Sequence, residues 1–216
     1  YSYRSVGPAF MSGRIADIAI DSNNENIWYV AVGSGGVWKT KNAGTTWMPL
    51  TDNMPFYSTG SITIDPNDSS RIWVGTGENV AGRHVGIGHG IYLSKDSGST
   101  WDDMGLNKSE HISKIIVHPD NSNIIWVASQ GPLWNSGGDR GLFMSTDGGN
   151  TWSNKLYVNE WTGVTDIIID PTNPDILYAA TWQRHRNVAS LIDGGPGTSI
   201  YKSIDGGNTW NEIDSG

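Results

Sequence analysis

The chain alternates short apolar runs with polar turns that contain Gly, Asn, Asp and Pro. No stretch has the spacing of apolar residues that is typical of a helix, so the pattern predicts an all-β fold of short strands. The strands fall into four repeats. First strands are expected at Ile15–Ile20, Ser61–Ile64, Ile112–Val117 and Val164–Ile169, and second strands at Ile27–Ala31, Arg71–Gly75, Ile124–Ala128 and Ile176–Ala180. Third strands are expected at Gly36–Thr40, Gly90–Ser94, Gly141–Ser145 and Ser199–Ser203.

A recurring motif, Ser/Thr-x-Asp/Asn-x-Gly-x-Thr-Trp, follows each third strand. Its short polar side chains bond back to nearby main-chain amides and hold a tight turn. Its Gly supplies a backbone angle that a side chain would penalise, and its Trp begins the fourth strand and serves as a packing anchor. We assign these structural roles to Thr40, Asn42, Gly44, Trp47, Ser94, Asp96, Gly98, Trp101, Ser145, Asp147, Gly149, Trp152, Ser203, Asp205, Gly207 and Trp210.

The motif tryptophans recur at intervals of 54, 51 and 58 residues. A period near 50 with four strands per repeat is typical of a β-propeller blade. We therefore predict one β-propeller segment over 1–216, with four four-stranded blades at approximately 15–50, 61–104, 112–156 and 164–213. The opening residues 1–7 contain a stretch similar to 101–105 and are interpreted as an extra closing strand. Because the fourth blade already has its own last strand, we expect further blades after Gly216; a closed four-bladed ring is the alternative.

The composition narrows the range of partners. A net charge of −8 argues against nucleic acid, since phosphate binding needs a basic face. No apolar run approaches the ~20 residues of a membrane span, so we expect no membrane insertion. The absence of Cys excludes a disulfide scaffold. No cofactor is expected, and no metal, because the five His lack zinc-type spacing and 21–25 imitates only part of a calcium loop.

The four motifs resemble Asp-boxes, the BNR-type repeats of sialidases, xyloglucanase-like glycosidases, sortilin-type receptors and many secreted bacterial propellers. The opening segment, from Tyr3 through Gly13–Asp21, is similar to the start of large bacterial proteins described as sortilin-like or glycosyl-hydrolase-like. This resemblance implies an extracellular or cell-surface bacterial protein with tandem propellers. It also implies that the Asp-boxes are structural and lie away from the ligand site, so the function is not fixed by the motif.

Long loops between second and third strands form the candidate functional face, at 76–89, 129–140 and 181–198. Function usually resides in such loops on a rigid scaffold. Together with the loops between blades, they carry aromatic and basic side chains that suit a sugar ring or a peptide. The candidate ligand-binding residues are Arg83, His84, His111, Trp134, Arg140, Trp161, Trp182 and Arg184. Among these, the arginines are expected to form a positive surface patch and the tryptophans a flat apolar surface beside it. The alternative is that these aromatics only pin down Gly-rich loops.

A glycoside hydrolase needs two carboxylates roughly 5–10 Å apart. Glu78, Asp139 and Asp193 are weak catalytic candidates. The xyloglucanase family places a catalytic Asp just before a Gly-Gly pair in the first blade, but the matching stretch Val32–Gly36 has no acid. The Arg-Ile-Pro opening of sialidases is also missing. We therefore favour a binding module for carbohydrate or protein. A xyloglucanase- or sialidase-like hydrolase is the alternative, and a purely structural domain of a large surface protein is the second alternative.

Overall fold

The computed structural model describes residues 13–213, and every regular element in this part of the chain is a β-strand. Blade 1 comprises β1 (Ile15–Ile20), β2 (Trp28–Val32), β3 (Gly36–Thr40) and β4 (Met48–Pro49). Blade 2 comprises β5 (Thr59–Asp65), β6 (Asp68–Thr76), β7 (Ile91–Ser94) and β8 (Asp102–Asp103). Blade 3 comprises β9 (Ile112–His118), β10 (Asn121–Ser129), β11 (Gly141–Ser145) and β12 (Ser153–Leu156). Blade 4 comprises β13 (Thr162–Asp170), β14 (Asn173–Arg186), β16 (Ile200–Ser203) and β17 (Asn211–Glu212), and a further strand, β15 (Leu191–Asp193), pairs with β14.

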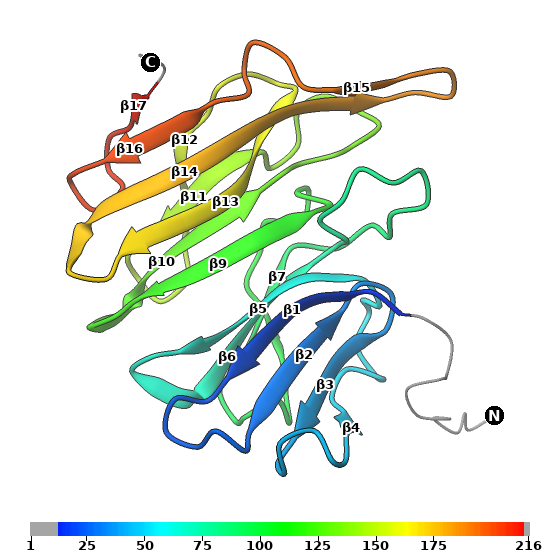
Figure 1. The fold of residues 1–216 in the computed structure, drawn as a ribbon, viewed down its shortest axis with the longest axis vertical. Coiled ribbons are helices and arrows are strands. Elements are labelled where there is room, and N and C mark those ends of the chain that lie inside the picture. The colour runs from blue at the N-terminus through cyan, green and yellow to red at the C-terminus, as the bar shows by residue number, and fades with distance from the viewer. Residues whose placement is uncertain (1–12, 214–216) are drawn as a thin grey trace.

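The four blades are antiparallel sheets that follow one another in chain order without closing into a ring (Figure 1). The first strands β1, β5, β9 and β13 contact their neighbours in sequence and form the line along which the blades meet. The all-β class and the four four-stranded sheets are confirmed. The extra closing strand expected in 1–7 lies outside the described residues. No helix that could cross a membrane is present between residues 13 and 213.

The main departure from the expected strands is in blade 4. The segment 181–198 was expected to be a loop, but β14 continues to Arg186 and pairs with β15. This hairpin is supported from outside, because the Arg186 main-chain N–H donates to the carbonyl of Leu133 in blade 3 at 3.0 Å. Such support between blades leaves no local signal in the sequence.

Each Asp-box turn is closed by one carboxylate or amide side chain. Asp147 accepts hydrogen bonds from the Thr151 main-chain N–H at 2.9 Å, the Thr151 hydroxyl at 2.6 Å and the Ser145 hydroxyl at 2.7 Å. Asp96 and Asp205 make the same set, and Asn42 accepts from the Thr46 N–H. The threonine bonds, followed by the serine bond, lower the pKa of Asp96, Asp147 and Asp205 to about 2.

Each turn is also bound to the hairpin between the first two strands of its own blade. The N–H of the residue before the motif Gly donates to the carbonyl at the start of the second strand. The four pairs are Ala43 to Asn26, Ser97 to Ser70, Gly148 to Asn123, and Gly206 to Asp175. The Asp-boxes therefore lie at the same end of the sheets as these hairpins, and the loops that join the second and third strands lie at the opposite end.

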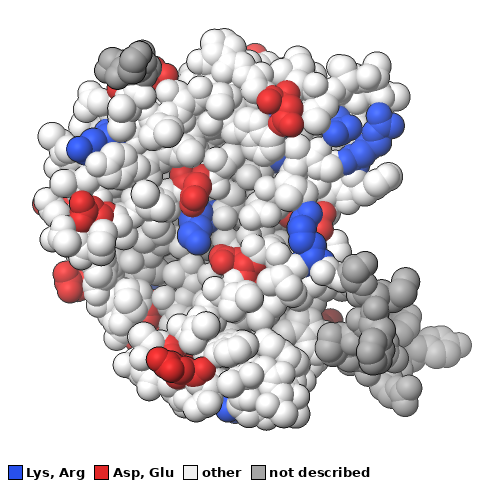
Figure 2. Space-filling model, in the orientation of Figure 1, with Lys and Arg blue, Asp and Glu red and all other residues white. Residues whose placement is uncertain are grey.

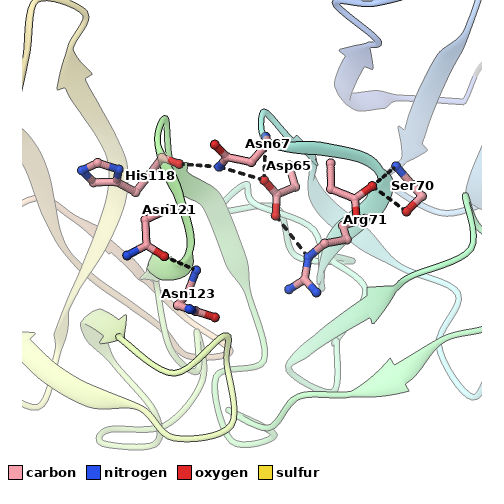
Figure 3. Close-up of polar contacts among 8 residues, drawn as sticks. Asp65, Asn67, Ser70, Arg71, His118, Asn121 and Asn123 are labelled. Atoms are coloured by element: carbon pink, nitrogen blue, oxygen red, sulfur yellow. Dashed lines mark hydrogen bonds and ion pairs between the residues drawn. The ribbon is translucent and has the colours of Figure 1, made fainter.

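The same hairpins join blade 2 to blade 3 (Figure 3). In the turn after β5, the buried carboxylate of Asp65 pairs with Arg71 at 3.1 Å and accepts from the Asn67 main-chain N–H at 2.9 Å. The Asn67 side chain then donates to the carbonyl of His118, the last residue of β9, at 3.0 Å. A buried carboxylate is tolerated when it is paired and hydrogen-bonded. Because Asp65 holds the turn and Asn67 bonds to His118, this cluster fixes the placement of blade 2 relative to blade 3.

Three apolar clusters fill the interfaces between successive blades. Each is centred on an aromatic residue of a second strand: Tyr29, Trp73 and Trp126 are all at most 1% exposed. The motif tryptophan of the following blade packs against the same cluster. These are Trp101 between blades 1 and 2, Trp152 between blades 2 and 3, and Trp210 between blades 3 and 4. The interior is thus divided into similar layers, as expected of a propeller.

Candidate functional site

The loops at the end opposite the Asp-boxes come together across three blades. From the β14–β15 hairpin, Arg184 Nη1 and Arg186 Nη2 each donate at 3.1 Å to a carbonyl of the blade 2 loop, Val80 and Ala81 respectively. Gln130, at the start of the blade 3 loop, donates to the Asn79 carbonyl at 3.3 Å. The three long loops therefore form one continuous surface, which we call the loop face.

Arg140 is the centre of this arrangement and is 1% exposed. Its guanidinium group donates to main-chain carbonyls of the loops around it, and no carboxylate between residues 13 and 213 forms an ion pair with it. The acceptors are the carbonyls of Gln130, Pro132, Asn135, Gly137 and Trp161. Burial lowers the pKa of Arg140 to about 10, and the group therefore keeps its charge at neutral pH. Arg140 acts as a structural clamp that fixes the blade 3 loop.

Arg184 has the same character. It is fully buried, and its Nη2 donates to the Gly131 carbonyl at 3.3 Å in addition to the bond with blade 2. Burial, together with the nearby charge of Arg140, lowers its pKa to about 9. The expected positive surface patch is therefore wrong for Arg140 and Arg184, because main-chain carbonyls enclose both guanidinium groups. Arg83 is exposed, and it donates to the Val188 carbonyl at 3.2 Å.

His111 is also enclosed, with 1% of its surface exposed. Burial, with a smaller effect of Arg184, lowers its pKa to about 3, so the imidazole is neutral at physiological pH. A ligand on the surface cannot contact it, which contradicts the interpretation of His111 as a surface ligand contact. His84 lies on an exposed part of the blade 2 loop.

The aromatic candidates remain at the surface. The ring of Trp161 lies 4.1 Å from that of His185, centroid to centroid, at an interplanar angle of 43°. Trp182 lies beside the Arg184 guanidinium carbon at 5.1 Å from the ring centroid. Both indoles are half-buried, and Trp134 is 36% exposed. Their role in ligand binding stays a prediction, but the arrangement offers partly accessible rings on loops that the two buried arginines hold in place.

The three candidate catalytic carboxylates are bound to different parts of the structure. Glu78 is 8% exposed, pairs with Arg14 at 3.0 Å, and accepts from the Ser34 hydroxyl and the Gly86 N–H. Asp139 accepts from the Lys108 main-chain N–H at 2.9 Å. Asp193 is exposed on β15. Glu78 and Asp139 thus hold loops in place. Between residues 13 and 213, no hydrogen bond or ion pair joins any two of the three carboxylates.

Glu110 is a carboxylate that the sequence reasoning did not select. It lies between blades 2 and 3, and burial raises the pKa of its carboxyl group, while Arg140 and Arg184 oppose the change. Its backbone has a φ of 59°, which is uncommon for a residue other than Gly. The strained backbone was not visible in the sequence. Over the part of the chain that the structure describes, no cluster of His, Asp and Glu is arranged to hold a metal ion.

Several curated proteins are similar to the chain over nearly its whole length. A probable oligoxyloglucan-reducing end-specific xyloglucanase of Neosartorya fischeri is 23% identical over 236 residues, which covers 99% of this chain and 25% of that protein. A xyloglucanase of Acetivibrio thermocellus is 27% identical over 232 residues, covering 96% of this chain and 26% of the relative. The chain therefore spans about a quarter of the length of these relatives.

Solved structures share the fold. A crystal structure of an ancestral GH74 enzyme superimposes with a TM-score of 0.71 at 23% identity, covering 94% of this chain and 24% of that one. The GH74 enzyme of Niastella koreensis gives a TM-score of 0.67 at 24% identity, with 90% and 28% covered. The Sortilin-Vps10 family model (Sortilin, neurotensin receptor 3) matches residues 89–216, which is more than half of the chain. This match, on four blades with Asp-box turns, shows that the chain belongs to the Sortilin-Vps10 family.

Proposed function

We propose that this chain is a segment of a glycan-directed β-propeller and that the loop face contacts the sugar. The observation that carries the proposal is a set of partly accessible rings: Trp134 and Trp161 lie on loops that the buried arginines hold, and Trp182 lies on β14 beside Arg184. Flat aromatic surface with polar groups at its edge suits the apolar faces of a sugar ring. The relatives named as xyloglucanases support a glycan over a protein ligand. An extracellular location belongs to the same proposal.

The fixed loops favour binding because they reduce the entropy that association costs. Arg140 and Arg184 occupy their donors with main-chain carbonyls, so the loop backbone is ordered before a ligand arrives. Preorganisation of this kind raises affinity without adding contacts. The arginines thus act through the loops, and direct contact is assigned to the tryptophans.

The binding experiment is affinity electrophoresis in gels that contain xyloglucan, with unrelated polysaccharides in parallel. Trp134→Ala and Trp161→Ala should each weaken retardation about tenfold, because burying one such ring contributes about 1–3 kcal/mol. Trp47→Ala is the matched control, since this half-buried tryptophan lies at the Asp-box end. Equal retardation of all three variants would contradict the assignment of the site, and absence of retardation by every polysaccharide would contradict the glycan proposal.

Glycoside hydrolysis is the second candidate. Its candidate acid is Glu110, because burial raises the pKa of this carboxyl group, which is the direction that a general acid requires. Release of reducing ends from xyloglucan is the measurement, and Glu110→Gln should abolish it. Glu78→Gln is the informative comparison, since Glu78 is already engaged by Arg14 and Ser34. If the chain binds xyloglucan and releases no reducing ends, the hydrolytic candidate is rejected and the binding module stands.

A further inference from the structure

The dipeptide Asp-Gly occurs three times in the chain, at 147–148, 193–194 and 205–206. This pair is chemically reactive, because the main-chain nitrogen of Gly can attack the side-chain carboxyl carbon of the Asp before it, and Gly has no Cβ to hinder the approach. The first and third copies lie inside Asp-boxes, whereas the second lies at the end of β15. One chain therefore holds the same reactive pair in two different environments.

In the Asp-box of blade 3, both reacting groups are already engaged. The Asp147 carboxylate accepts from the main-chain N–H and the hydroxyl of Thr151 and from the hydroxyl of Ser145. The Thr151 bonds, followed by the Ser145 bond, lower the pKa of Asp147 to about 2, and the oxygen of an ionised carboxylate is a poor leaving group. The attacking nitrogen is restrained as well, because the Gly148 N–H donates to the carbonyl of Asn123 at 3.0 Å.

The Asp-box of blade 4 repeats both restraints. The Asp205 carboxylate accepts from the Thr209 N–H at 2.9 Å, the Thr209 hydroxyl at 2.6 Å and the Ser203 hydroxyl at 2.8 Å. The Gly206 N–H donates to the carbonyl of Asp175 at 3.0 Å. Ring closure at either Asp-box must therefore first break hydrogen bonds on both sides of the new bond.

The pair at the end of β15 has neither restraint. Asp193 is exposed, and its carboxylate makes no hydrogen bond or ion pair with another residue between 13 and 213. Over the same range, the Gly194 N–H donates no main-chain hydrogen bond. Gly194 has a φ of 144° and no atom within 4 Å of an added Cβ, so the space around the pair is open. The two reacting groups can approach each other without losing other contacts.

We propose that Asp193–Gly194 is a site of spontaneous main-chain modification, at which Asp193 converts to isoaspartate, and that the Asp-boxes protect the other two pairs. The Gly194 nitrogen forms a bond to Cγ of Asp193. The bond between Cγ and its hydroxyl oxygen breaks, and the hydroxyl leaves with the amide proton as water. Water then opens the five-membered imide at either carbonyl. One opening restores Asp, and the other routes the main chain through Cβ, so the net change is an isomerisation.

The modified residue belongs to the hairpin of the loop face. Asp193 pairs with Arg184 across β14 and β15, and Arg184 binds carbonyls of the blade 2 and blade 3 loops. Isoaspartate lengthens the main chain by one carbon atom, so it disturbs this strand pairing. The modification therefore acts on the loop face and leaves the Asp-box end intact.

Peptide mapping of the folded protein after incubation in mildly acidic buffer tests the proposal. Trypsin separates the sites, because peptide 187–202 contains Asp193 as its only acidic residue and peptide 141–155 contains Asp147 as its only one. Isoaspartate is recognised by a shifted retention time at unchanged mass and by enzymatic methylation of isoaspartyl groups. It should accumulate in 187–202 at least about tenfold faster than in 141–155, because hydrogen bonds to an ionised carboxylate oppose closure at Asp147. Equal rates in the folded protein would overturn the proposal.

Two controls separate the fold from the local sequence. In urea the two peptides should form isoaspartate at comparable rates, since unfolding removes the Asp-box bonds; a persistent excess at Asp193 would mean that the fold protects nothing. Asp193→Glu should abolish the signal in 187–202, because a six-membered ring closes much more slowly.

Thr151→Ala tests the protection directly. This variant removes one bond to the Asp147 carboxylate, so below its melting temperature we expect isoaspartate in 141–155 to form several-fold faster than in the unaltered protein. An unchanged rate would contradict the protective role of the Asp-box.

Discussion

Polar side chains at the two ends of the sheets have different tasks at the residue scale. At the Asp-box end, carboxylates close turns on the surface and gain their effect from several short bonds to one threonine and one serine. At the loop end, the guanidinium groups of Arg140 and Arg184 are withdrawn from water and donate to carbonyl oxygens. Both arrangements satisfy main-chain groups that regular strand pairing leaves free.

Because of the Asp-box carboxylates, we expect the folded protein to lose stability in acid. Their folded pKa of about 2 lies below the ordinary value of 3.8, so the ionised form is preferred in the folded state. Their contribution is complete above about pH 4 and is lost as the pH falls toward 2. Asp147→Asn should keep most of the neutral-pH stability, because Asn42 already makes equivalent bonds in blade 1, and should reduce the loss between pH 4 and 2. Asp147→Ala should be less stable at every pH, and thermal melts across this range distinguish the three proteins.

We expect substitution of a buried arginine to lower the free energy of unfolding much more than substitution of an exposed one. Arg184→Met removes donors from two enclosed carbonyls in different loops, so we expect the free energy of unfolding to fall by about 2–4 kcal/mol. Arg83→Met is the matched control, because this exposed side chain makes one bond at the surface and should change stability by less than about 0.5 kcal/mol. Urea unfolding measures both. Similar stability of the two variants would contradict the clamping role of Arg184.

The burial of Arg140, Arg184 and His111 was beyond the reach of the sequence. A charged residue in a Gly-rich loop is normally exposed, and only the crossing of loops from blades 2, 3 and 4 encloses these groups. The choice of Trp134 and Trp161 as ligand contacts rests on the sequence and stays a prediction, although both side chains are partly exposed. The burial of Glu110 was beyond the sequence for the same reason, since its environment is made by residues far away in the chain.

At the scale of elements, the glycines of the last two Asp-boxes meet an aromatic ring of the blade before them, Gly149 against Trp73 and Gly207 against Trp126. A Cβ on Gly207, at a φ of 85°, would lie 2.5 Å from Trp126 Nε1. The backbone conformation alone makes alanine unfavourable there, by about 1–2 kcal/mol. The contact adds an overpacking cost of about 1–3 kcal/mol, because the ring is fully buried and cannot move aside.

Gly137 separates these two effects. It has a φ of 72° and no atom within 4 Å of an added Cβ. Gly137→Ala should therefore show only the conformational cost, and Gly207→Ala should be less stable than Gly137→Ala in urea unfolding. Equal destabilisation of the two variants would mean that the close contact between Gly207 and the Trp126 ring does not contribute to stability.

The positions of the strands could be predicted where the residues that determine them lie close together in the sequence. The four motifs carry their own hydrogen-bond partners within eight residues, so the third and fourth strands of each blade could be placed from the motif alone. The β14–β15 hairpin could not, because Leu133 and Ala81 of other blades support it. The segment 181–198 contains Gly-Gly-Pro and few strand-forming residues, which is typical of a loop.

At the scale of the whole molecule, the blades form an arc in which the Asp-box turns and the long loops lie at opposite ends of the sheets. Acidic side chains are scattered over the side shown in Figure 2, without a single extended patch, while basic side chains gather near the edge where the loop face lies. A net charge of −8 spread in this way keeps the protein in solution and leaves recognition to local contacts. The loop face is thus the surface on which partly exposed aromatic rings and a fixed backbone occur together.

The most direct test of the central claim is a map of tryptophan protection with and without xyloglucan oligosaccharide. Hydroxyl-radical modification, read by mass spectrometry, reports all eleven tryptophans in one experiment. The account predicts that saturating oligosaccharide protects Trp134, Trp161 and Trp182 and leaves the half-buried Trp28 and Trp47 at the Asp-box end unchanged. Protection confined to Trp28 and Trp47, or no protection of any tryptophan at saturation, would contradict it.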